Sequence, residues 1–298
     1  MKIAACAYEP EWHASWEALE SKLDGWVADA AGQGAELLVF PEYAGIEATL
    51  IGPPFPDPGP MGWVQRMTRA ADGWGRLNAT LAERHGVHIL AGSLCADYAG
   101  QVVNRAYLCT PGGEVASQEK MIPTPYERQI MGLSGGRGLT LFDTALGRIG
   151  VLICYDSEFP LLARALVEAG ADLLLVPSCT DMPQGQTRVR QSCRARAIES
   201  QCPVVQAPLI GVVGGCDIVD GSTGRVGIFG PPDIGQPEDG ILGQGTLDTA
   251  GWVIADLDLR AIAAPRRIGQ VGNMADWPMQ RRPDMSVPVM PLGRPAED

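Results

Sequence analysis

Apolar positions along the chain fall into two alternating patterns. Short continuous apolar runs, which are typical of buried strands, occupy residues 2–8, 36–40, 87–92, 149–153, 172–176 and 203–207. Between these runs, apolar residues recur every three or four positions. This spacing predicts helices over about residues 12–30, 62–84, 158–169 and 184–201. Because strands and helices alternate in both halves, we expect an α/β fold in which helices cover sheets from outside.

Turn residues mark the remaining elements. A first hairpin is predicted where Pro-Gly-Gly separates residues 102–109 from 114–119, and a second joins residues 139–144 to 148–153. Residues 120–138 form a long irregular loop, and a loop of this length in a compact domain usually indicates function. Further strands are expected over residues 216–229 and 250–257. We expect one domain over residues 1–264, followed by an extended proline-rich tail over 265–298 that docks on the body or on a partner subunit.

Composition narrows the class of protein. The 298-residue chain has a formal net charge of −12, so nucleic acids and anionic membranes are poor partners. The first residues are too short an apolar run for a signal peptide, and no run approaches the roughly 18 apolar residues of a membrane span. The eight cysteines form no C-x-x-C pair, which favours reduced thiols in a cytoplasm over disulfides or a zinc site.

One cysteine, Cys154, directly follows a strand-like run. After it, Asp156 or Ser157 can cap a helix. Pro160 falls in the first helical turn, where a missing N–H is tolerated, and Gly170 can end the helix. A thiol between a strand end and a helix start lies in the positive field of the helix dipole, which favours the thiolate. Cys154 is therefore a candidate nucleophile, and a small buried apolar side chain is the alternative interpretation.

Other catalytic motifs fit poorly. Residues 132–136 match G-x-S-x-G, but their flanks are loop-like, whereas a nucleophile elbow needs a strand before it and a helix after it. All the histidines, at positions 13, 85 and 88, precede both Ser134 and Cys154. In serine hydrolases with a nucleophile elbow and in papain-like proteases, the catalytic histidine follows the nucleophile in the sequence. Phosphate-binding and dinucleotide-binding glycine motifs are missing from the sequence.

If Cys154 is a nucleophile, its base must therefore be a carboxylate or a lysine. Glu42 directly follows the apolar run over residues 36–40, and Lys120 and Glu127 lie in the long central loop. Taken singly, each of these residues has the alternative interpretation of an exposed loop charge, which is what most Glu and Lys residues are.

Taken together, these residues resemble the nitrilase superfamily of carbon–nitrogen hydrolases. Leu-Val-Phe-Pro-Glu over residues 38–42 is similar to its first motif, and Glu-Lys-Met-Ile-Pro over 119–123 to its second. Gly-Val-Leu-Ile-Cys-Tyr-Asp over residues 150–156 is similar to its third motif, and residues 170–178 and 194–199 resemble other family segments. The resemblance covers about residues 1–260. It implies a four-layer α-β-β-α sandwich, usually assembled as a homodimer or a higher homo-oligomer.

The resemblance also implies roles for the candidate residues. Cys154 would attack an amide or nitrile carbon, and Glu42 would move the protons. Lys120 and the backbone N–H of Tyr155 would stabilise the tetrahedral oxyanion, while Glu127 would orient Lys120 or the substrate nitrogen. We expect no metal and no organic cofactor in this chemistry.

The segment after the nucleophile bears on the substrate. Nitrilases tend to have Cys-Trp-Glu there, whereas this chain has Cys-Tyr-Asp over 154–156, which favours the amidase-like branches. Omega-amidase-like members carry an arginine two residues further on, where this chain has Glu158. Glu158 either favours a neutral or cationic substrate or simply suits the first helical turn. Candidate pocket walls are Tyr43, Tyr126, Cys179 and Thr180.

The sequence therefore predicts a cytoplasmic enzyme that hydrolyses a small non-peptide amide through a cysteine thioester. Hydrolysis of an N-carbamoyl amine or a nitrile, or acyl transfer from the thioester, are the alternatives within the family. A non-catalytic thiol redox sensor or scaffold on the same fold is an alternative of another class.

Overall fold

The computed structural model describes residues 1–280 and 287–290 of the chain. Its described strands form two sheets. The first sheet is built from β1 Lys2–Ala7, β2 Leu37–Val39, β3 His88–Tyr98, β4 Gln101–Cys109, β5 Val115–Glu119 and β12 Gly251–Asp256. Its order is β12-β1-β2-β3-β4-β5, and β1, β2 and β3 run parallel at its centre.

The second sheet repeats this arrangement. It is built from β6 Leu141–Thr144, β7 Gly147–Val151, β8 Leu173–Ser178, β9 Val204–Pro208, β10 Gly227–Phe229 and β11 Ile241–Gln244. Its order is β11-β10-β9-β8-β7-β6, and β7, β8 and β9 are its parallel strands. The strands β2, β8 and β9 are buried along their whole length, as continuous apolar runs in parallel strands require.

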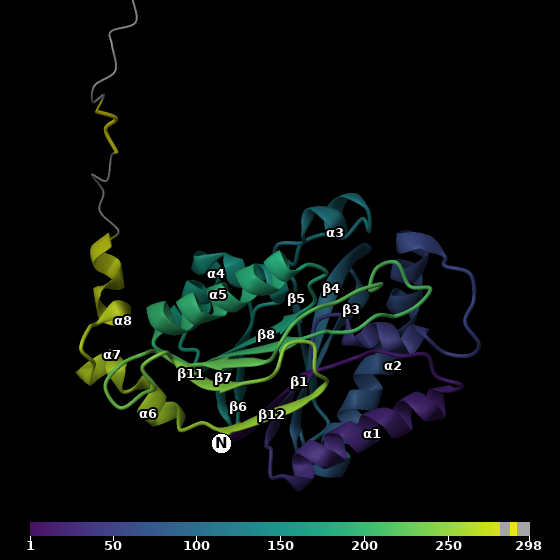
Figure 1. Cartoon of the computed structure of the whole chain (residues 1–298), viewed down its shortest axis with the longest axis horizontal. Coiled ribbons are helices and arrows are strands. Elements are labelled where there is room, and N and C mark those ends of the chain that lie inside the picture. Colours follow the sequence, from purple (N-terminus) through teal and green to yellow (C-terminus); the bar gives the residue numbers. More distant parts are fainter. Residues whose placement is uncertain (281–286, 291–298) are drawn as a thin grey trace, which may run out of the picture.

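Helices cover the outer faces of the two sheets. The helices α1 Trp16–Gly32 and α2 Gly59–His85 pack on the first sheet, and α4 Pro160–Glu168 and α5 Pro183–Ser200 pack on the second (Figure 1). The predicted α-β-β-α order is therefore confirmed. No helix in the described part of the chain combines the length and the apolar character needed to cross a lipid bilayer.

The structure corrects two predictions about irregular regions. Within residues 216–229, only β10 is a strand, because the preceding part folds into tight turns such as that closed by Cys216 N–H on Val213 O. Residues 265–280 are not extended but form α7 Pro265–Ile268, α8 Asn273–Asp276 and the 3-10 helix η3 Trp277–Gln280. Proline is favourable at the first position of α7, which allows a helix where the sequence suggested an extended chain.

Part of the predicted tail docks on the body of the molecule. The Nε of Arg266 donates to the carbonyls of Ser200 and Gln201 at the end of α5, each at 3.1 Å. The backbone N–H of Met274 donates to Gln201 Oε1, also at 3.1 Å. Figure 1 shows α7 and α8 with α6 Leu259–Ala263 at this end of the molecule. Residues 281–286 and 291–298 of the predicted tail lie outside the described residues.

A bulge in β3 positions the loop that follows β2. Gly92 lies in this bulge with a φ of +68°, and a Cβ built on it would lie 2.0 Å from Pro41 O. The next residue, Ser93, donates its N–H to the same carbonyl and accepts the N–H of Tyr43 on its Oγ. The loop that carries Glu42 therefore rests directly on backbone that only glycine can provide.

We expect Gly92→Ala to lower the free energy of unfolding by about 2–4 kcal/mol, because the left-handed φ and the clash with Pro41 O add. Gly25→Ala on the exposed side of α1 is the matched control, since its added Cβ meets nothing within 4 Å. That change should raise stability by about 0.5–1 kcal/mol. Urea denaturation measures both, and a neutral Gly92→Ala would contradict the argument.

Candidate active site

Strand ends from both sheets deliver the predicted catalytic residues to one buried place. Glu42 lies just beyond β2 and Lys120 directly follows β5 in the first sheet. Cys154 follows β7 in the second sheet, at the start of the 3-10 helix η2 Cys154–Glu158. Glu127 lies in the short helix α3 Pro125–Gln129 within the long central loop. Each of these side chains is at most 4% exposed, although the sequence left an exposed loop charge as the alternative interpretation of the charged ones.

Lys120 joins the two glutamates. Its Nζ lies 2.7 Å from Glu42 Oε1 and 2.7 Å from Glu127 Oε2. The backbone also holds this lysine, since its N–H donates to Asn104 O at 2.8 Å. Glu127 is fixed by a capping box in which Thr124 N–H donates to Glu127 Oε2 and Thr124 Oγ1 accepts Glu127 N–H. The ammonium is thus paired on both sides, as a buried charge must be.

Asn104 and Tyr43 complete the polar network. Asn104 Nδ2 donates to Glu42 Oε1 at 2.9 Å and to Glu127 Oε1 at 3.0 Å, so one amide bridges both carboxylates. Tyr43 OH donates to Glu127 Oε1 at 2.6 Å. Asn104 is not among the residues predicted from the sequence, although a polar residue within the β4 run is a signal that could mark it.

Burial and the shared lysine separate the pKa values of the two glutamates. Burial raises the pKa of Glu42 above its usual range, with Lys120 opposing and Glu127 adding to the rise. For Glu127, burial acts in the same direction, but Lys120 and Tyr43 hold its pKa below the usual range. Burial would lower the pKa of Lys120, yet the two carboxylates raise it well above normal. The result is an ionised Glu127, a protonated Lys120 and a Glu42 suited to accepting a proton.

Cys154 sits on a strained turn beside Glu42. Its φ of 49° lies in the left-handed region, which is unusual for a residue with a Cβ and recurs at functional sites. Its Sγ donates to Cys179 O at 3.5 Å, while Cys179 N–H donates to Glu42 Oε2 at 2.9 Å. The backbone of one residue after β8 therefore links the thiol to the carboxylate.

The surroundings of Cys154 oppose the preference for the thiolate that the local sequence suggests. Burial, and then the negative charge of Glu42, raise the pKa of Cys154 well above its usual value. The helix-dipole argument fails here because a 3-10 turn follows the cysteine and α4 begins only at Pro160. The resting side chain is a thiol, and ionisation requires proton transfer to a neighbouring base.

Asp156 is not the N-cap of α4, contrary to one of the two predicted options, because Phe159 holds that position. Its carboxylate instead accepts the N–H groups of Ile122, Met121 and Ile153 at 2.8, 3.1 and 3.3 Å. It therefore ties the segment after Lys120 to the strand end before the nucleophile. Ser157, the other option, donates its hydroxyl to Cys154 O at 2.6 Å. The side chains of this turn thus fix the site itself rather than α4.

The predicted pocket residues divide into two groups. Tyr43 and Cys179 belong to the buried network described above. Thr180 is tied to the neighbouring loop, since its Oγ1 donates to Thr223 O at 2.8 Å, and Tyr126 on α3 is 43% exposed. The carboxylate of Glu158 lies 3.3 Å from Arg188 Nε on α5, so the structure does not bring it into the buried network.

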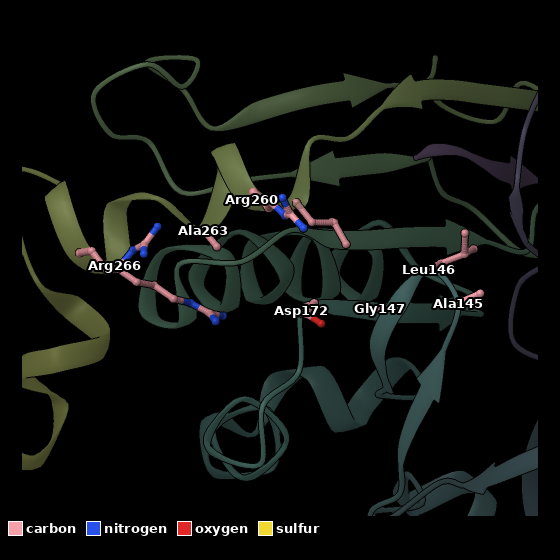
Figure 2. A pocket seen from close by; sticks show the side chains of 9 residues that line it. Ala145, Leu146, Gly147, Asp172, Arg260, Ala263 and Arg266 are labelled. Carbon is pink, nitrogen blue, oxygen red and sulfur yellow. The ribbon is translucent and has the colours of Figure 1, made fainter.

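Other features of the molecule lie apart from this network. A cavity of about 570 Å³ is lined by residues of the β6–β7 turn, by Asp172 and by α6 and α7, and none of its lining residues is a predicted site residue (Figure 2). Glu11, His13 and Glu47 are close enough to hold a metal ion. However, Lys22 Nζ lies 2.6 Å from Glu47 Oε1 and already supplies the positive charge there.

The comparisons with known proteins identify the family. The family model described as Carbon-nitrogen hydrolase matches residues 2–267, so this chain belongs to the carbon–nitrogen hydrolase family. The chain is 33% identical over 276 residues to the probable hydrolase YhcX of Bacillus subtilis (strain 168), covering 93% of this chain and 53% of that protein. It is 27% identical over 191 residues to an omega-amidase of Danio rerio, covering 61% of this chain and 65% of that protein. The matched region thus spans about half to two thirds of these relatives.

Solved structures show the same fold. An amidase from Nesterenkonia sp. AN1 superposes with a TM-score of 0.67 at 24% identity, covering 90% of this chain and 94% of that chain. Its structure shows the acetamide moiety of fluoroacetamide added covalently at the active-site cysteine. Nit3 of Saccharomyces cerevisiae, a nitrilase-superfamily member, superposes with a TM-score of 0.69 at 19% identity. The match covers 90% of this chain and 93% of that chain. The resemblance inferred from the motifs is therefore confirmed at the level of family and fold.

The carboxyl of Asp156 provides a pH-dependent test of this geometry. Burial raises its pKa to about 7, with its backbone donors opposing the rise. Because the unfolded pKa is about 3.9, the folded protein holds an extra proton between these values. The contribution of the protonated Asp156 carboxyl to the free energy of unfolding is therefore complete below about pH 4. It is lost as the pH rises through about 7.

Asp156→Asn removes this titration. We subtract the free energy of unfolding of the variant from that of the wild type. We expect this difference to decrease as the pH rises from about 5 to about 8. Urea denaturation at both pH values measures the difference. A difference that stays constant or increases with pH would contradict the buried-carboxyl assignment.

Proposed function

We propose that this protein is an amidase that hydrolyses the C–N bond of a small amide through a thioester on Cys154. The observation that supports it most is the buried Lys120 ammonium, paired with Glu42 and Glu127 at 2.7 Å on either side. Such a group supplies positive charge in a dry site without a metal ion, where a developing oxyanion needs it. The family membership supports the same reaction class.

The proposed first half-reaction forms the thioester. Glu42 accepts the thiol proton of Cys154 as the sulfur attacks the amide carbon. Lys120 and the backbone N–H of Tyr155 stabilise the oxyanion, and removing one such donor typically costs about 10²- to 10³-fold in rate. Glu42 then returns its proton to the leaving nitrogen, and ammonia or an amine departs as the C–N bond breaks.

The proposed second half-reaction releases the acid. Glu42 accepts a proton from water as that water attacks the thioester carbonyl, and the same cationic site stabilises the second oxyanion. The C–S bond then breaks, and Cys154 regains its proton. Burial raises the pKa values of both Glu42 and Cys154, so each group binds a proton more readily than it would in water. Transfer of the proton between the two groups is therefore favoured.

The substrate class rests on the relatives. Proteins described as an omega-amidase and as a deaminated glutathione amidase are among them, and the latter, from Yersinia enterocolitica, is 38% identical over 106 residues, 36% of this chain and 37% of that protein. We propose an amide over a nitrile on this ground and on the Cys-Tyr-Asp segment. The pairing of Glu158 with Arg188 supports its structural role rather than selection of substrate charge.

Cys154→Ala should abolish ammonia release from primary amides, with a loss of at least about 10³-fold, because no thioester can form. The measurement is ammonia release from a panel of primary amides, nitriles and N-carbamoyl amines, each in cationic, neutral and anionic forms. Cys109→Ala is the matched control, since it removes a buried thiol at the end of β4 and should leave turnover unchanged.

Each outcome of the panel has a defined meaning. Near-normal turnover in a folded Cys154→Ala protein would refute the mechanism. Cysteine-dependent turnover of only nitriles or only N-carbamoyl amines would replace the amide by that substrate class. Complete inactivity of the wild type on all three classes, with reversible oxidation of Cys154, would favour the redox-sensor alternative over catalysis.

We also propose that the chain acts as a homodimer in the cytoplasm. The family resemblance supports this assembly, and Leu161 on α4 and Ile198 on α5, which are 70% and 40% exposed, are candidate contact residues. Light scattering after size exclusion should give about twice the 31.6 kDa of the chain, and a monomer at micromolar concentration would refute the dimer. All the cysteines are free, which supports a reducing compartment, and cell fractionation tests this location.

A further inference from the structure

Three arginines interact electrostatically where α5 packs against β10 and β11. Arg190 and Arg194 lie one turn apart on α5, and Arg225 lies just before β10. The Nη2 of Arg190 donates to Gln244 Oε1 on β11 at 2.8 Å, and the Nη2 of Arg194 donates to Asp239 O at 2.9 Å. These bonds fix two of the guanidinium groups between α5 and the β10–β11 pair.

Two donors of this cluster are buried without an acceptor. Among the described residues, neither Arg190 Nη1 nor Arg225 Nε has a hydrogen-bond partner. The Oε1 of Gln206, a residue only 1% exposed, also has no partner there. Gln206 is paired with Gly227 across β9 and β10, so both residues face the same side of the sheet. Its amide can present an acceptor or, when rotated, a donor.

The local packing holds Arg190 in place. Its guanidinium carbon lies 5.0 Å from the centre of the Phe229 ring, in a cation–π arrangement. A Cβ built on Gly227 would lie 3.0 Å from Arg190 Nη1 and 2.2 Å from the Phe229 ring, so glycine leaves the room that this stack requires. The unpaired Nη1 is therefore a fixed donor rather than the end of a free side chain.

The electrostatics of the cluster are unfavourable as it stands. Burial, followed by the like charges of Arg225 and Arg194, lowers the pKa of Arg190. Within the described residues, none of the three arginines has a carboxylate oxygen within the 4.0 Å of a salt bridge. A buried donor without an acceptor is destabilising, and more so when it is charged. A negatively charged ligand would remove both penalties.

We propose that Arg190, Arg194 and Arg225 form a binding site for an oxyanion, the phosphate or carboxylate group of a small molecule. The guanidinium group presents several N–H donors in a planar fork that matches both groups. Arg190 Nη1 and Arg225 Nε come from different elements, so one anion would connect α5 to the segment before β10. Among the described residues, none of the three arginines takes part in the hydrogen bonds and ion pairs of the network around Lys120, Glu42 and Cys154.

The test uses the thermal unfolding of the full chain with inorganic phosphate or succinate, against chloride at equal ionic strength. We expect phosphate, succinate or both to raise Tm by about 2–4 °C at saturating concentration, because ligands that bind only the folded state stabilise it. Arg190→Gln and Arg225→Gln should each abolish this rise. Arg69→Gln, which removes an exposed charge on α2, is the matched control and should retain it.

The two anions distinguish the sources of the ligand group. A rise with phosphate alone identifies a phosphorylated ligand, and a rise with succinate alone identifies a carboxylate. No rise with either anion, or an equal rise in Arg190→Gln and Arg225→Gln, would overturn the proposal. If Arg190→Gln does not fold, Arg225→Gln with isothermal titration calorimetry of the active anion decides the question.

Discussion

The pairing of the Lys120 ammonium with Glu42 and Glu127 is the interaction on which the candidate site depends. A buried ammonium is tolerated only when carboxylates or other acceptors surround it, and here each carboxylate oxygen lies 2.7 Å away. Because the three residues come from the ends of β2 and β5 and from α3, the ion pairs also fix the central loop on the first sheet. Removal of one partner would leave an uncompensated charge, so structure and chemistry depend on the same atoms.

The nucleophile comes from the other sheet, which makes the contact between the sheets part of the site. Cys179 accepts from the Cys154 thiol with its carbonyl and donates to Glu42 with its N–H. Asp156 extends this connection, because it accepts backbone N–H groups from both sides of the site. The relative position of thiol and base is thus set by backbone atoms, which hold their geometry better than long side chains do.

Local sequence patterns predicted the central strands and the long helices, and they suggested the catalytic candidates. Apolar runs located the central strands, and the motifs around Glu42, Lys120 and Cys154 indicated the family that the comparisons confirm. Local sequence patterns do not predict that Asn104 bonds to Glu42. This contact depends on the packing of β4 beside the loop that follows β2. These patterns also misjudged the ionisation of Cys154, because the helix-dipole argument is local whereas burial depends on the whole fold.

Buried charged groups need partners of opposite charge. The Lys120 network meets this requirement, whereas the cluster of Arg190, Arg194 and Arg225 does not within the described part of the chain. Lys120 is buried and paired with a carboxylate on either side, so the candidate site is preorganised. Arg190 is held by its bond to Gln244 and its stack on Phe229, yet Arg190 Nη1 and Arg225 Nε are both buried without an acceptor among the described residues. In a chain with 35 acidic and 23 basic residues, carboxylates are abundant enough to pair three arginines. Arg190 instead feels the like charges of Arg225 and Arg194, which favours a ligand as the source of the missing negative charge.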